Sequence, residues 1–185
     1  HEILKPHRVH ELIERAQAMF EKHGPVPALM LFKADLFDAI ARSADALDTL
    51  AIASKAHPTD RDLLSEFNTR SQAMDELRRL AKAIKAELST HPGDLTARRD
   101  LALTYHRLQR FEAAEAIYRA ILKDQPAADD VRIDLARMFA SQQRYDTALG
   151  TLAPALRRPK HSPEVDCLAG QLMHRGLDRK QEAAA

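Results

Sequence analysis

The 185-residue chain is 45% apolar and nearly neutral, with 28 Lys and Arg against 27 Asp and Glu. Its length fits about one domain, and its charge balance argues against a general nucleic-acid binder and against a disordered chain. A single cysteine, Cys167, excludes an internal disulfide framework and a cysteine-based zinc site. Frequent Ala and Leu with only 5 Gly favour helix.

The first predicted element is an amphipathic helix over residues 9–22, which the sequence His23-Gly24-Pro25 ends. No apolar run reaches the ~18 residues that a membrane span needs, and we recognise no signal peptide. Because the chain begins at His1 rather than Met, we expect a fragment or processed product of a longer protein of bacterial type. Its compartment, cytoplasm or periplasm, stays open.

A period of 34 residues separates Pro58, Pro92 and Pro126, each of which lies between helical patterns. Residues 27–60 carry a degenerate copy of this repeat, from which Lys33 and Ser43 depart. The residues that keep the frame there are Ala34, Phe37, Ala46, Leu50, Ala53 and Pro58.

The next copy, residues 61–94, is less regular still. It contains no Gly or Pro between Thr59 and His91, and its apolar residues recur at spacings of three, four and seven. One long helix over residues 60–90 is therefore favoured over a hairpin. Arg70 interrupts the apolar stripe and argues against an extended coiled coil.

Residues 95–128 and 129–162 are the two clear copies. Leu101-Ala102 aligns with Leu135-Ala136, and the other aligned pairs are Tyr105 with Phe139, Phe111 with Tyr145, Ala114 with Ala148, and Tyr118 with Leu152. Each copy predicts two antiparallel helices that approach closely at small residues, while aromatic side chains fill the space beside them. The proline then ends the second helix.

This pattern resembles the tetratricopeptide repeat family, whose hallmark sites coincide with Leu101, Ala102, Tyr105, Phe111, Ala114, Tyr118 and Pro126. The family's large aromatic near the start of the first helix is absent, and Arg98 and Arg132 stand there instead. The resemblance implies an all-α fold of antiparallel helical hairpins stacked as a right-handed α-solenoid. We expect one continuous domain, with an N-terminal helical region at 1–94 and the clear repeats at 95–176.

A further unit is predicted over residues 163–176, beginning at Pro163 and ending at Gly176. Residues 177–185 form either a short capping helix or a tail. Pro154 lies inside a predicted second helix and should kink it or end it early.

The resemblance implies a binding face along the exposed sides of the first helices. The candidate partner-binding residues are Arg99, Leu103, His106, Arg107, Ile133, Arg137, Gln171, His174 and Arg175. A protein or peptide with acidic groups is one candidate partner. Acidic neighbours such as Asp130, Asp134 and Glu164 partly neutralise the face, and an ordinary solvated surface is the simpler explanation of its charge.

Catalytic and metal chemistry find little support. The sequence has no phosphate-binding glycine loop, nucleophile elbow or dinucleotide fingerprint. His7, His10, Glu11 and Glu14 share a helix face, but the zinc-protease pattern would need a second His in place of Glu14. We therefore expect no cofactor and no metal, a Cys167 that is buried in packing or inert, and a solvated loop at Arg157-Arg158, with an anionic contact as its alternative.

The sequence thus predicts a non-enzymatic scaffold or adaptor that binds a protein or peptide partner, with no nucleic acid and no membrane span. Two alternatives stay open. The first is homo-oligomerisation, through the long segment 60–90 or a terminal face that carries Leu12, Met19 and Phe20. The second is a periplasmic or envelope helper domain of a larger membrane or secretion protein.

Overall fold

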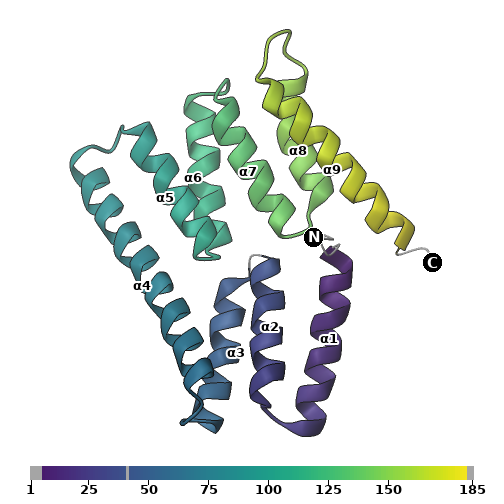
Figure 1. Ribbon diagram of the computed structural model, residues 1–185. Helices are drawn as coiled ribbons and strands as arrows, with labels where there is room; N and C mark the ends of the chain where they lie inside the picture. The colour runs from purple at the N-terminus through teal and green to yellow at the C-terminus, as the bar shows by residue number, and fades with distance from the viewer. Residues whose placement is uncertain (1–5, 41, 183–185) are drawn as a thin grey trace. The chain divides into compact units, whose positions relative to one another are not determined.

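The computed structural model describes residues 6–40 and 42–182, with side chains for 8–40 and 42–177 (Figure 1). These residues are helical throughout, apart from the connections. The helices are α1 (Pro6–His23), α2 (Pro27–Ala39), α3 (Ser43–Ala56), α4 (Arg61–Thr90), α5 (Leu95–Arg107), α6 (Phe111–Asp124), α7 (Asp129–Ser141), α8 (Tyr145–Leu156) and α9 (Pro163–Glu182).

The described residues form two compact units. The first unit contains the residues up to Leu80 with Arg107–Gln109, and the second contains Ala81–His106 and the residues from Arg110 onward. The helix α4 contributes to both, since the division falls within it.

The 34-residue period sets where helices begin. The starts of α2, α4, α5, α7 and α9 follow one another at intervals of 34 residues. We call these the A helices, and α3, α6 and α8, which complete a hairpin with the A helix before them, the B helices. The predicted hairpins at 95–128 and 129–162 are confirmed, as is the all-helical repeat fold. The degenerate copy at 27–60, for which the sequence left the hairpin open, also forms one, with α2 packed on α3.

Three A helices end in the same way. The amide of an arginine donates to the carbonyl of an aromatic residue five positions earlier, and the guanidinium lies over that aromatic ring. The pairs are Arg42 with Phe37 (N···O 2.8 Å, guanidinium to ring centre 5.0 Å), Arg110 with Tyr105 (2.8 and 5.9 Å) and Arg144 with Phe139 (3.0 and 4.6 Å). Gln109 and Gln143 adopt φ of 58° and 59° just before the arginine, as in a Schellman motif.

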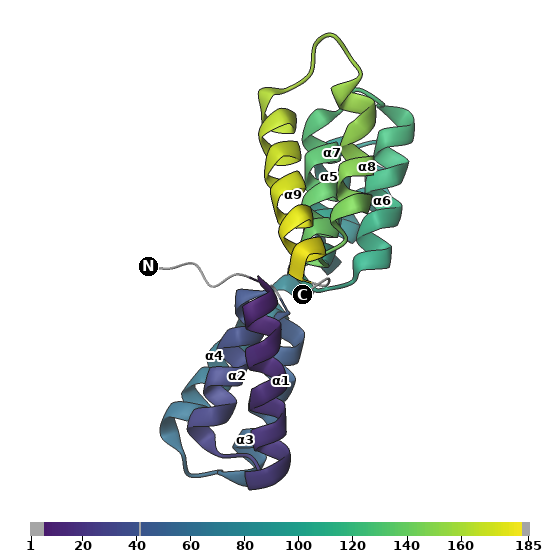
Figure 2. The same cartoon turned by 90° about the vertical axis from the view of Figure 1, so that its right-hand side faces the viewer.

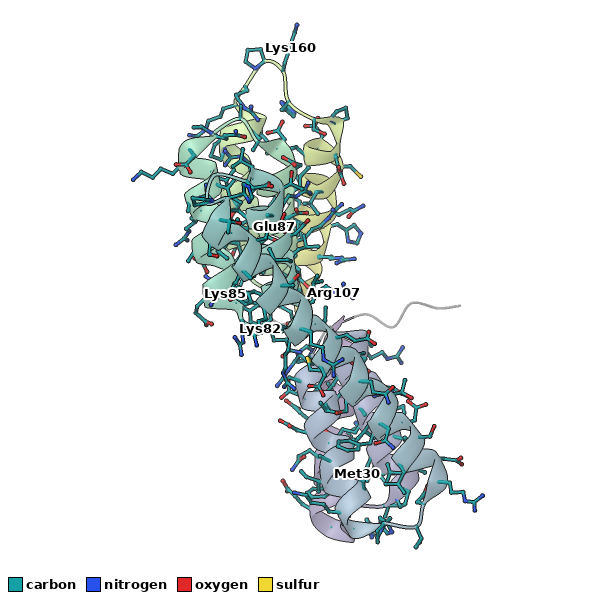
Figure 3. All side chains as sticks on the ribbon, turned by 90° about the vertical axis from the view of Figure 1, so that its left-hand side faces the viewer. Met30, Lys82, Lys85, Glu87, Arg107 and Lys160 are labelled. Atoms are coloured by element: carbon teal, nitrogen blue, oxygen red, sulfur yellow. The ribbon has the colours of Figure 1, made fainter. Side chains whose placement is uncertain are left out.

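The helix α4 has neither partner of this pair. Ser71 and Glu76 stand at the two positions, and the helix continues for 30 residues, which confirms the long helix predicted over 60–90. Arg70 binds the carboxylates of Asp35 and Asp38 on α2 at 2.6 and 3.0 Å. Lys82 and Lys85 lie on the exposed side of the C-terminal part of α4 (Figure 3).

Small residues let the helices of the second unit approach closely, as predicted. Ala102, Ala114, Ala136 and Ala148 are fully buried beside Tyr118 and Phe139. Arg132 replaces the aromatic expected from the family pattern, and it is also buried. Its guanidinium donates to the carbonyls of Pro126 and Thr151 at 2.6 and 3.3 Å. The arginine therefore holds the helix start by hydrogen bonds rather than by ring packing.

The first unit has a smaller core, to which Met30, Ala34, Phe37 and Leu50 contribute. Lys33 is buried within it and donates to the Gln17 side chain of α1. Its ammonium lies 5.6 and 5.7 Å from the ring centres of Phe20 and Phe37. Burial lowers the pKa of Lys33.

The C-terminal predictions had mixed outcomes. The end predicted at Gly176 is wrong, because α9 continues through it to Glu182. A Cβ at Gly176 would lie 3.6 Å from the Cβ of Tyr145, which is an ordinary van der Waals contact. The early end predicted at Pro154 is confirmed, since α8 stops at Leu156, two residues short of the repeat-equivalent end of α6. Residues 183–185 of the predicted tail lie outside the described part.

Candidate partner-binding face

The A helices of the second unit present one continuous row of polar contacts. Figure 2 shows α7 and α9 on one side of this unit and α6 and α8 on the other. The contacts run from each A helix to the next: Arg99 to Asp134 (2.6 Å) and Asp130 (2.8 Å), His106 to Ser141 (3.1 Å), and Arg137 to Glu164 (2.6 Å). We call this side of α5, α7 and α9 the A-helix face.

At the α5 end of the face, Arg99 forms an ion pair with the buried carboxylate of Asp134. The carboxylate of Asp134 is 9% exposed, and it accepts from Nε of Arg99 while Asp130 accepts from a terminal nitrogen. The hydrogen bond to Asp134 raises the pKa of Arg99. Separating this pair would leave the buried carboxylate of Asp134 without its partner. Arg99 therefore stabilises the fold and is not available to bind a partner protein.

The neighbouring groups at this end are held neutral. Burial lowers the pKa of His106, although Asp134 opposes the shift, and its ring centre lies 6.0 Å from that of Phe111. Burial also raises the pKa of the Tyr118 hydroxyl well above its usual value. This end of the face therefore offers little free charge to a partner.

The middle of the face is different. The side chains of Arg137 and Glu164 are 52% and 55% exposed, so their ion pair lies in solvent. Exposed pairs of this kind contribute about 0–1 kcal/mol. Arg137 can therefore exchange Glu164 for another carboxylate at small cost.

Comparison with known families decides what kind of repeat this is. Two family models, both described as tetratricopeptide repeat, match residues 75–129 and 109–172, and together they cover more than half of the chain. The chain belongs to the tetratricopeptide repeat family. Its members generally mediate protein–protein interaction and are generally non-catalytic. A comparison with curated protein sequences found no match.

Most of the predicted face residues lie at the surface of this tetratricopeptide repeat protein. Leu103, Arg107, Arg137, Gln171, His174 and Arg175 are exposed, and Arg99 and His106 are half-buried. Ile133 is 2% exposed, so its expected place on the open face is wrong, because its side chain packs within the core cluster of the second unit. Arg107 groups with the first unit, whereas the other predicted residues belong to the second.

The pairing of these side chains across repeats was not predicted. Arg99 and Asp134 lie 35 residues apart, as do His106 and Ser141, which is one repeat plus one residue. That offset is the signal in the sequence that could have revealed the pairing.

The other predicted chemistry can be placed as well. Among the side chains that the structure describes, no three His, Cys, Asp or Glu lie close enough to hold a metal, and His7 of the candidate cluster is outside them. In the loop after α8, Arg158 pairs with Asp129 and His161 with Asp166 at 3.0 Å, while Lys160 points into solvent (Figure 3). No described helix is long and apolar enough to cross a membrane.

Proposed function

We propose that this tetratricopeptide repeat protein is a non-catalytic interaction module that binds a peptide segment of a partner protein on the A-helix face. The observation that carries the proposal is the exposed Arg137–Glu164 pair, with Leu103 exposed on the neighbouring α5 and Gln171 on α9. The general role of the family supports the same surface.

The exposed groups define the kind of peptide that would fit. A partner carboxylate can replace Glu164 on the guanidinium of Arg137, because the existing pair contributes little in solvent. An apolar partner side chain can cover Leu103, which is 37% exposed. Arg99 does not take part, since Asp134 and Asp130 already occupy it.

A selection from a library of phage-displayed peptides tests this function. Bound peptides are expected to carry an acidic residue near an apolar one. Their binding should weaken about tenfold or more with Arg137→Glu and with Leu103→Glu, as expected for a central contact. The matched control is Arg119→Glu on α6, which reverses another exposed arginine paired with a glutamate, Glu115, at 2.8 Å.

Two results would count against the proposal. Peptides that bind the wild type and both face variants equally would place binding elsewhere. Peptides that are lost equally with Arg119→Glu would show a general charge effect rather than a site. Circular dichroism of each variant separates loss of binding from loss of fold.

A further inference from the structure

The two terminal helices each occupy half of a repeat. Residues 9–22 of α1 align with α3 and α6 when shifted by whole repeats of 34, so α1 stands in the B-helix frame. By the same shift α9 follows α7 and stands in the A-helix frame. Within the described residues, α1 has no A helix before it and α9 has no B helix after it.

The position in α1 that would meet an A helix is open. Met19 is 52% exposed, whereas its repeat counterparts Ala53, Ile121 and Ala155 are 0–1% exposed. In the complete hairpins these counterparts are covered, and α2 packs directly on α3 and α7 on α8. Met19 is therefore an apolar position of the B-helix frame that is left exposed in α1.

The corresponding face of α9 is open in the same way. Met173 is 52% exposed, while its counterpart Phe139 is 1% exposed. Gly170 stands where Ala34, Ala102 and Ala136 are fully buried, and nothing lies within 4 Å of a Cβ built on it. Leu177, one turn further along, is 61% exposed. These residues form an apolar strip with a gap at Gly170.

The charges beside this apolar strip on α9 indicate which helix would fit it. In one complete hairpin, α5 with α6, Arg98 near the start of α5 binds Asp124 at the end of α6 at 2.9 Å. The counterpart of Arg98 in α9 is Asp166, whose side chain is 64% exposed and contacts His161. The counterpart of Asp124 in α1 is the exposed Lys22. The signs are reversed on both sides, so α1 and α9 remain complementary in the same register.

We propose that α9 of one copy and α1 of a second copy pack together and complete a repeat between two chains. Leu12 of α1 stands in the frame of Ala114 and Ala148, so it would fill the gap at Gly170. The contact joins two different surfaces and leaves one of each free, so it is heterologous and continues head to tail. It uses other residues than the A-helix face and does not depend on the proposed peptide binding.

Sedimentation velocity over a concentration series of the full 185-residue chain tests this pairing. The wild type is expected to grow beyond a dimer as concentration rises. Met19→Asp and Met173→Asp should each give monomers, because each removes one of the two surfaces. A mixture of these two variants should give dimers and nothing larger. Ile52→Asp is the matched control on α3, where Ile52 is 50% exposed, and it should associate like the wild type.

Several outcomes would overturn the pairing. A wild type that stays monomeric at every concentration removes it, including the case in which another segment of the same chain covers these helices. Dimers formed by either aspartate variant alone would mean that like surfaces meet, which a heterologous contact excludes.

The register has a test of its own. Lys22→Glu alone and Asp166→Lys alone should each weaken association about threefold to tenfold, as for a surface ion pair. The double variant should recover it, since the reversed charges meet again across two copies. If the double variant associates as weakly as the two single changes combined predict, the register is wrong, and so is the pairing built on it.

Discussion

The two units keep the same 34-residue frame with different sequences. In the second unit, small residues and aromatic residues recur at fixed places and build the larger buried cluster. In the first unit, a lysine is buried in the core, and only α2 and α3 form a hairpin of the same kind. Helix starts nevertheless stay in register from α2 to α9. The 34-residue spacing of helix starts is therefore kept although the core residues of the two units differ.

The arginine–aromatic pair at the turn is present where an A helix ends and absent where it continues. Where an arginine covers an aromatic ring, as in Arg144 over Phe139, the A helix ends after 13 residues. Where Ser71 and Glu76 replace that pair, α4 runs on. In α9 the aromatic position is Met173, and that helix also continues past the turn position. One short motif thus decides between a hairpin and a long helix.

The largest difference is expected from equivalent leucines in the two cores. Leu50 and Leu152 occupy the same repeat position and are both fully buried. Each change to alanine should lower the free energy of unfolding by about 2–5 kcal/mol. Because the first unit has the smaller cluster, Leu50→Ala should release the amides of α2 and α3 to hydrogen exchange, while Leu152→Ala leaves α7 and α8 protected. Equal loss of protection would contradict the comparison.

The next difference concerns the ion pairs that join successive A helices. Asp134→Asn should lower the free energy of unfolding by about 1–3 kcal/mol, because this carboxylate is buried against Arg99. Asp35→Asn in the first unit should cost less than about 1 kcal/mol, since Asp35 is 66% exposed and Arg70 retains Asp38. Urea unfolding of the two variants measures both values, and a larger cost for Asp35→Asn would reverse the comparison.

Much of the fold could be predicted because it depends on local patterns. Prolines 34 residues apart and the small residues Ala102 and Ala136 were enough to indicate the hairpins. The uninterrupted run from Thr59 to His91 indicated the long helix. The glycine at 176 predicts a helix end, whereas α9 continues through it. A glycine inside a helix weakens it without having to end it, and the sequence pattern alone does not distinguish the two cases.

The face could be predicted only in outline. The resemblance to the repeat family placed Leu103 and Arg137 on an exposed side, as the structure has them. It could not show that Arg99 is occupied by Asp134, since that contact depends on how two helices 35 residues apart are stacked. Ile133 failed for the same reason, because its burial comes from neighbouring repeats rather than from its own helix.

A smaller effect is expected from glycine at one repeat position, where it should raise the free energy of unfolding in one unit and lower it in the other. Gln143 adopts φ of 59°, a conformation that glycine accepts without strain, so Gln143→Gly should raise the free energy of unfolding by about 0.5–1 kcal/mol. Asp75 is its counterpart inside α4 and pairs with Arg78 at 2.8 Å. There Asp75→Gly should lower the free energy by about the same amount. Thermal unfolding of both variants gives the signs, and like signs would show that the turn motif does not set the helix end.

The smallest effect is a difference in pH dependence between the units. The Nε2–H of the His161 imidazole donates to the carboxylate of Asp166 at 3.0 Å, and this hydrogen bond raises the pKa of His161 above 6.5. Its contribution to stability is therefore complete below pH 6.5 and is lost as pH rises through the raised pKa. Lys33 of the first unit has a pKa lowered by burial, so between that lowered pKa and 10.5 the unfolded chain binds more protons, and within this window stability rises with pH.

Hydrogen exchange at pH 6 and 8, corrected for the intrinsic rate, separates these opposite slopes. Raising the pH should weaken protection at the start of α9 and leave or strengthen it in α2. His161→Gln should remove the change in α9 alone, since Gln does not titrate, and Lys33→Met should act only on the first unit. The imidazole titration followed by NMR gives the direction independently. A midpoint below 6.5 would mean that the contact with Asp166 does not hold the α8–α9 loop in solution, even if the rest of the second unit keeps its fold.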